Sequence, residues 1–194
     1  MKRYGILGGT FDPPHIAHSI IAEDVKEQLT LDKIIFIPSG NPPLKNSISS
    51  EHRLAMAKLA FADNEYFEIS EVEIRNTDEK SYTVNTLTQM KSDPVYADSE
   101  LFLIIGMDNL INLPKWKDPD KLFELAKIIV INRPDFDLKN VNEEYLKKAE
   151  FVDVPEMGIS SSMIRKRIEQ GKSVRYMVSE MVEDYIRRNE LYKK

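Results

Sequence analysis

Short apolar runs recur along the chain, separated by longer stretches in which apolar residues follow helical spacing. The four clearest runs lie at residues 4–7, 34–37, 101–105 and 128–131. Runs this short, bounded by glycine, proline or polar residues, predict buried β-strands rather than helices. The run at 101–105 is the most apolar and predicts a central strand of a parallel sheet, because such strands are buried on both faces. Segments 66–74 and 151–154 predict two weaker strands.

The stretches between these runs predict helices. Residues 16–29 have the spacing of a single apolar helical stripe, formed by Ile16, Ile20, Ile21, Val25 and Leu29. A second helix, capped by Ser49 or Ser50, places its apolar residues at Leu54, Ala55, Leu59 and Ala62. Further helices are expected to open at 81–87 and to cover 178–194. Strands that alternate with helices predict an α/β fold, a Rossmann-like parallel sheet of five or six strands with helices on both faces.

Composition narrows the class of protein. A chain of 194 residues with 42% hydrophobic and 30% charged residues is typical of one globular domain, so we expect a single domain over 1–194. The chain contains no cysteine, which excludes thiolate catalysis and disulfides. We find no apolar run of membrane-spanning length and no signal peptide, and therefore expect a cytoplasmic protein without a membrane partner. The net charge of −5 argues against a nucleic-acid partner. The sequence leaves open whether the protein is a homo-oligomer.

The strongest chemical pattern is the stretch at 8–18, GGTFDPPHIAH, which links the first predicted strand to the first predicted helix. Gly8 and Gly9 let the backbone bend tightly and let a ligand approach it closely. The free N–H groups at the start of the following helix favour an anion in the mouth of the turn. His15 and His18 are three residues apart and share one face of that helix. The sequence shows no third ligand nearby for a zinc ion, so no metal site is predicted.

This stretch resembles the GG(S/T)FDPxHxGH motif of the nucleotidyltransferase superfamily that uses paired histidines. Over nearly its whole length the chain is most similar to the bacterial nicotinate-mononucleotide adenylyltransferases. Two departures are visible, since Ala17 replaces the usual glycine and Leu44 replaces a histidine in the loop NPPLK. By this resemblance, Lys45 in that loop would reach the substrate phosphates, and Arg133 after the strand at 128–131 would contact a phosphate.

A second motif near the C-terminus, GISSSMIRKR at 158–167, supports the same resemblance. The family has IS(S/T)xxIR here, which wraps the triphosphate and adenine of ATP, so the helices over about 159–194 would complete the ATP site. Gly106 and Asp108, which follow the strand at 101–105, are placed to bind ribose hydroxyls. The family has G-x-D at this position. The resemblance implies an ATP-binding set of Gly8, Gly9, Thr10, Phe11, His18, Gly106, Asp108, Ile159, Ser160, Ser161 and Arg165.

The mononucleotide would bind on the other side of the turn. The segment SYTVNTL at 81–87 matches the family's SYTxxTL motif, and Trp116 matches a tryptophan that packs on the nicotinate ring. Ser81 or Thr83 is also expected to cap the helix that begins here. The implied mononucleotide-binding set is Thr10, Lys45, Thr83, Thr86, Trp116 and Arg133.

The implied reaction is adenylyl transfer from ATP to nicotinate mononucleotide, giving deamido-NAD and pyrophosphate in NAD biosynthesis. The attacking phosphate is already an anion, so catalysis would consist of alignment and charge neutralisation, with Mg²⁺ carried by ATP. The catalytic set would be His15, His18, Lys45 and Arg165. Three alternatives stay open: phosphopantetheine or nicotinamide mononucleotide as the acceptor, or a nucleotide sensor without turnover. The loop at 39–48 is a candidate lid.

Overall fold

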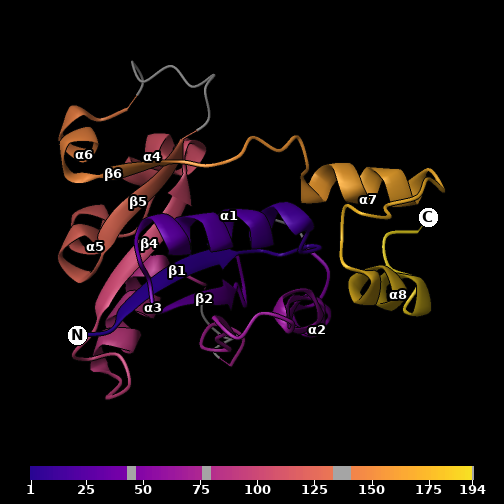
Figure 1. Cartoon of the computed structure of the whole chain (residues 1–194), viewed down its shortest axis with the longest axis horizontal. Coiled ribbons are helices and arrows are strands. Elements are labelled where there is room, and N and C mark those ends of the chain that lie inside the picture. The colour runs from indigo at the N-terminus through magenta and orange to yellow at the C-terminus, as the bar shows by residue number, and fades with distance from the viewer. Residues whose placement is uncertain (43–46, 76–79, 133–140, 194) are drawn as a thin grey trace.

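The computed structural model describes residues 1–42, 47–75, 80–132 and 141–193, and its centre is one parallel β-sheet (Figure 1). The strand order is β3-β2-β1-β4-β5-β6, and every neighbouring pair is parallel. The strands are β1 (Arg3–Gly9), β2 (Lys33–Pro38), β3 (Phe67–Ile69), β4 (Glu100–Gly106), β5 (Lys127–Asn132) and β6 (Glu150–Asp153). The predicted α/β sheet of five or six strands is confirmed.

Helices cover both faces of this sheet. One face carries α1 (Ile16–Gln28) and α2 (Ser50–Phe61). The opposite face carries α3 (Thr83–Ser92), α4 (Met107–Asn112), the 3₁₀ helix η1 (Leu113–Lys115), α5 (Pro119–Leu125) and α6 (Glu143–Lys148). The last two helices, α7 (Ser161–Glu169) and α8 (Glu180–Arg188), pack with α2 in a third apolar cluster. Figure 1 shows α7 and α8 side by side near the C-terminus, beyond the N-terminal end of α1.

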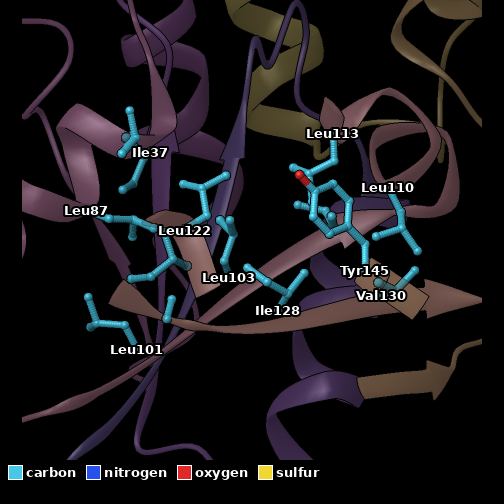
Figure 2. Close-up of a cluster of buried hydrophobic side chains, with 14 of the residues drawn as sticks. Ile37, Leu87, Leu101, Leu103, Leu110, Leu113, Leu122, Ile128, Val130 and Tyr145 are labelled. Atoms are coloured by element: carbon cyan, nitrogen blue, oxygen red, sulfur yellow. The ribbon is translucent and has the colours of Figure 1, made fainter. Parts of the chain in front are cut away.

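The apolar strands contribute side chains to two hydrophobic cores, one on each face of the sheet. Along β4, Leu101, Leu103 and Ile105 belong to the cluster under α3 to α6, whereas Phe102 and Ile104 belong to the cluster under α1 and α2. Figure 2 shows the first of these clusters. Successive side chains of a strand point to opposite faces, so a strand covered on both sides must be apolar throughout. This explains why 101–105 was readable as a central strand.

The path of the chain creates a topological switch point at the carboxyl ends of two strands. From β1 the chain proceeds outward to β2 and β3, then returns to place β4 on the other side of β1. The neighbouring carboxyl ends of β1 and β4 therefore lead into connections that run in opposite directions across the sheet. Open α/β sheets bind ligands at such a point, and it lies here between Gly8–Gly9 and Gly106.

Two predicted helical faces differ from the observed ones. Ile16 and Ile20 are 41% and 38% exposed, and they line a cavity of about 540 Å³ with Tyr66. The buried face of α1 keeps the predicted Ile21 and Val25 and adds Ala17 and Ala22. In α2 the buried residues are Arg53, Met56, Ala57 and Phe61. The predicted faces were chosen from side-chain hydrophobicity alone. Which residues are buried depends instead on where the sheet and α8 pack against each helix.

The predicted third strand was also too long. Only Phe67–Ile69 pairs with β2, and residues 71–75 leave the sheet in turns. Ser49 caps α2 as expected, since its hydroxyl accepts from the N–H of His52. The departure of 71–75 from the sheet brings Glu73 against the end of β2. A Cβ at Gly40 would lie 2.0 Å from the carbonyl oxygen of Glu73.

We predict that Gly40→Ala will lower the free energy of unfolding by about 1–3 kcal/mol, because overpacking displaces the segment that carries Glu73. Gly158→Ala is the matched control, since a Cβ at Gly158 meets no atom within 4 Å. Urea unfolding of both variants measures the difference. Equal stabilities would show that the contact with Glu73 does not constrain this loop.

Candidate active site at the carboxyl ends of β1 and β4

The two histidines of the first motif lie at the start of α1, as predicted. His15 is the N-cap residue, and its ring stacks on that of His18 with centroids 3.7 Å apart and planes inclined by 23°. The backbone N–H of His15 donates to Nδ1 of His18 at 3.1 Å. This bond makes Nδ1 an acceptor, so the neutral His18 ring carries its proton on Nε2. His18 therefore has one N–H left to donate.

The environment keeps the His18 ring neutral. Burial, and secondarily the charge of His15, lower the pKa of His18 from 6.5 to about 3. Desolvation disfavours the charged form of a histidine, and a neighbouring cation disfavours it further. At neutral pH, His18 consequently acts as a neutral hydrogen-bond donor in the ligand-free protein.

The ring of Phe11 packs against the ring of His18. Its ring is 3% exposed and meets the His18 ring edge to face, with centroids 5.1 Å apart. A Cβ at Gly9 would lie 3.0 Å from Cζ of Phe11, so the turn needs a glycine where the ring passes under it. The Phe11 side chain is thus committed to packing, and only its backbone remains for the predicted contact with ATP.

Arg53 of α2, which was not predicted, holds the turn from inside the protein. The residue is 1% exposed, and its guanidinium donates to the carbonyl oxygens of Thr10 at 3.0 Å, Gly40 at 3.0 Å and Ile48 at 3.2 Å. Burial lowers the pKa of Arg53, while the carboxylate of Asp12 opposes that shift. One buried cation thereby fixes the turn after β1, the segment after β2 and the approach to α2.

The C-terminal motif docks on the same turn. Arg165 of α7 donates from Nη1 to the carbonyl oxygen of Asp12 at 2.6 Å, and Ser161 donates to the carbonyl oxygen of Pro13 at 2.8 Å. Ser160 caps α7 by accepting from the N–H of Met163. The Arg165 side chain remains 38% exposed, although its Nη1 is bonded to the turn.

One expectation for the start of α1 has to be corrected. The backbone N–H of Ile16 donates to the carbonyl oxygen of Met177 at 2.9 Å, and that of His18 donates to the carbonyl oxygen of His15 at 2.9 Å. These two groups are therefore satisfied within the protein. An anion at this turn would therefore receive no hydrogen bond from these two N–H groups.

Three of the predicted mononucleotide residues, Thr83, Thr86 and Trp116, lie at or near the start of α3. Lys117, next to Trp116, donates to Oδ1 of Asn85 at 3.2 Å and lies over the ring of Tyr82. The half-buried Trp116 packs against the same apolar cluster as Tyr82. These contacts place the segment of Trp116 beside Thr83, the first residue of α3. The structure thus brings together residues that lie more than 30 positions apart.

Thr86 lies deeper than expected. It is 6% exposed, and its hydroxyl donates to Oε1 of Glu73 at 2.6 Å. Burial raises the pKa of Glu73, although hydrogen bonds from Thr86, Ser81 and the N–H of Gly40 oppose the shift. A hydroxyl has one proton to donate, so a ligand carboxylate would have to displace Glu73 to receive it.

The predicted cap of α3 was wrong. Tyr82 is the N-cap residue, and no side chain caps the helix. The Ser81 hydroxyl instead accepts from the N–H groups of Gly40 at 3.0 Å and Asn41 at 3.1 Å. Ser81 thereby fastens the segment after β2 to the start of α3.

Of the remaining predicted residues, some lie within the described part of the chain and others lie outside it. Asp108, in the first turn of α4, is exposed, and its Oδ1 would lie 2.6 Å from a Cβ at Gly106. Gly8 is exposed at the end of β1, and Ile159 packs on the cluster that joins α2, α7 and α8. Lys45 and Arg133, together with Leu44 of the candidate lid, lie outside the described residues.

Arg53 and Glu73 were missed because a lone charged residue in an amphipathic pattern is usually solvent-exposed. A signal for Arg53 was present, since Arg53, Met56, Ala57 and Phe61 follow the i, i+3, i+4, i+8 spacing of one helical face. Glu73 offered no comparable signal, because its burial results from contacts with Gly40 and with α3.

The chain is similar in sequence to a known family of proteins. Residues 6–167 match the model of the cytidylyltransferase-like family. A probable nicotinate-nucleotide adenylyltransferase from Lachnoclostridium phytofermentans is 39% identical over 99% of this chain and all of that protein. Another from Thermomicrobium roseum is 40% identical over this entire chain and 92% of that protein.

Solved structures give the same fold. The nicotinic acid mononucleotide adenylyltransferase of Plasmodium falciparum, in complex with NaAD, superimposes with a TM-score of 0.82. The two chains are 21% identical, with 99% of this chain and 98% of that one covered. The same enzyme in complex with APC superimposes with a TM-score of 0.79. The structural likeness shows that the two proteins share a fold.

We predict that Arg53→Met will lower the free energy of unfolding by at least about 3 kcal/mol, because three carbonyl groups lose a buried donor. Lys58→Met on the same helix is the control. It removes an exposed ion pair with Glu71, which is worth less than about 1 kcal/mol. Similar losses in the two variants would refute the structural role of Arg53.

The pKa of His18 predicts a pH dependence of stability. The unfolded chain binds a proton at His18 below about pH 6.5, whereas the folded protein does so only near pH 3. The free energy of unfolding therefore decreases as the pH falls from 6.5 towards 3. His18→Asn lacks this contribution, so it should lose less stability than the wild type between pH 7 and pH 4.5 in urea unfolding. Equal losses would contradict the buried neutral state.

Proposed function

The chain belongs to the nicotinate-nucleotide adenylyltransferases, and we propose that its paired-histidine turn, with α7, holds ATP for transfer of the adenylyl group to nicotinate mononucleotide. The proposal rests on one observation above all. His15 and His18 stack at the carboxyl end of β1, and Arg165 from the C-terminal motif is bonded to the same turn. The products are deamido-NAD and pyrophosphate, in NAD biosynthesis.

The reaction needs alignment more than acid–base chemistry. A phosphate oxygen of the mononucleotide attacks the α-phosphorus of ATP and forms a new P–O bond. The bond from that phosphorus to the oxygen bridging the α- and β-phosphates breaks, and its electron pair leaves with pyrophosphate. The nucleophile is an anion at neutral pH, so no side chain has to remove a proton. Donors fixed in advance around the phosphates lower the barrier.

In this proposal the triphosphate lies between the histidines and α7. His18 offers its Nε2–H, and the accessible part of Arg165 supplies positive charge. Ser161 is bonded to the turn through Pro13, which supports the proposal that residues 159–194 complete the ATP site. The adenosine would contact the family set described above, namely Gly8, Gly9, Thr10, the Phe11 backbone, Gly106, Asp108, Ile159 and Ser160.

The acceptor would bind on the α3 side of the turn. Thr10 would face its phosphate, and Thr83, Thr86 and Trp116 would surround its pyridine ring. The contacts of Lys117 with α3 support this grouping. Phosphate contacts from Lys45 and Arg133 remain predictions.

We propose that Mg²⁺ arrives on the phosphates of ATP. Among the described residues no group of three or more His, Asp or Glu could hold a metal ion, so the ion would share phosphate ligands.

No helix within the described residues is long and apolar enough to span a bilayer. A cytoplasmic location and the lack of a nucleic-acid partner stay predictions from composition and charge.

The function is tested by pyrophosphate release with ATP and Mg²⁺, comparing nicotinate mononucleotide, nicotinamide mononucleotide and phosphopantetheine. A strong preference for nicotinate mononucleotide is expected. Preference for either other acceptor would overturn the assignment of the acceptor pocket. Tight ATP binding without turnover would favour a nucleotide sensor.

We predict that His18→Ala will lower the rate of adenylyl transfer by about 100- to 1,000-fold, because it removes one preorganised donor to the phosphates. Circular dichroism and thermal unfolding check that the variant folds. A rate within a few-fold of the wild type would remove His18 from the catalytic set.

A further inference from the structure

The C-terminal end of the chain reaches the catalytic turn through one side chain. After α8 the backbone turns sharply, with positive φ angles of 51° at Glu190 and 63° at Tyr192. The Tyr192 hydroxyl donates to Oδ1 of Asp12 at 2.6 Å, across 180 positions of sequence. Leu191 and Tyr192 also pack against the apolar cluster that joins α2, α7 and α8. Tyr192 is therefore held in place on two sides.

Asp12 is shared between Tyr192 and Arg165. The Asp12 residue is 4% exposed, and its Oδ2 lies 3.9 Å from Nη1 of Arg165. The same Nη1 donates to the Asp12 carbonyl oxygen at 2.6 Å. Burial and the bond to Asp12 raise the pKa of Tyr192, so its hydroxyl keeps the proton that it donates. Tyr192 thus satisfies one carboxylate oxygen, and Arg165 stays bonded mainly to the backbone.

Removing the Tyr192 hydroxyl would change this division. A buried carboxylate oxygen without its donor gains by finding another one. Two cations lie near Asp12, and the guanidinium of Arg53 is already bonded to three carbonyl oxygens. Arg165 is therefore the cation that can turn to Asp12, and a guanidinium can bind both oxygens of a carboxylate at once. A two-point pair of this kind would turn Arg165 away from the phosphates of ATP.

We propose that Tyr192 is a positioning residue that occupies Asp12 and thereby leaves Arg165 free to bind the phosphates of ATP. The proposal rests on the function proposed above, because it assumes that Arg165 meets ATP. It assigns to the end of the chain a role that packing of α8 alone would not require.

Steady-state kinetics of Tyr192→Phe test the proposal, with Tyr185→Phe as the matched control. Tyr185 also belongs to the C-terminal segment, and its hydroxyl lies 2.9 Å from Nδ1 of His52, a residue of α2 outside the turn. Each variant loses one hydroxyl and one long-range hydrogen bond. We expect Tyr192→Phe to raise the KM for ATP by about 10-fold, the usual size for a hydrogen bond to a charged group. The KM for nicotinate mononucleotide should stay within about two-fold.

The control separates positioning from general support of the fold. Tyr185→Phe should leave the KM for ATP unchanged while shifting the thermal unfolding midpoint about as much as Tyr192→Phe does. Equal effects of the two variants on the KM for ATP would overturn the proposal, as would an unchanged KM in Tyr192→Phe.

A second variant tests the mechanism. In Tyr192→Phe combined with Asp12→Asn, the side chain beside Arg165 is neutral and cannot capture it. We expect the ATP dissociation constant of this double variant, measured by calorimetry, to lie closer to the wild-type value than that of Tyr192→Phe. A double variant that binds ATP no better than Tyr192→Phe would refute capture by Asp12.

Failure of the proposed function would be recognised separately. In that case the wild-type protein releases no pyrophosphate with nicotinate mononucleotide. The dissociation constants for ATP of the wild type, Tyr192→Phe and Tyr185→Phe still decide the role of Tyr192, because the proposal predicts weaker binding only in Tyr192→Phe.

Discussion

Two guanidinium groups hold the backbone of the turn after β1. Arg53 donates to the carbonyl oxygen of Thr10 from inside the protein, and Arg165 donates to that of Asp12 from α7. Burial of a guanidinium is unfavourable, and the three carbonyl groups around Arg53 with the nearby charge of Asp12 offset it. Because Arg53 also binds Gly40 and Ile48, the turn, the end of β2 and α2 form one unit.

His18 and Arg165 set the electrostatics of the site. His18 is held as a neutral donor by its bond from the His15 backbone and by burial, whereas Arg165 contributes a permanent charge. A neutral ring and a cation beside one glycine-rich turn suit an anionic reaction whose nucleophile needs no activation. In the proposed mechanism, the protein aligns two phosphates and stabilises the leaving pyrophosphate.

The sheet and the histidine turn were predictable because their signals are local. A strand buried on both faces must be apolar throughout. The glycines and histidines of the turn all lie within eleven consecutive residues, 8–18. The role of Arg53 depends on which face of α2 meets the sheet, and the Tyr192–Asp12 bond spans 180 positions. Ser81 was misread for the same reason, since its partners Gly40 and Asn41 belong to another segment.

The most direct test is a crystal structure of the protein with deamido-NAD bound. The account predicts that the adenylyl phosphate lies within hydrogen-bonding distance of Nε2 of His18. It also predicts that the pyridine ring lies between Trp116 and the start of α3. A dinucleotide whose phosphates lie away from the paired histidines would contradict the account.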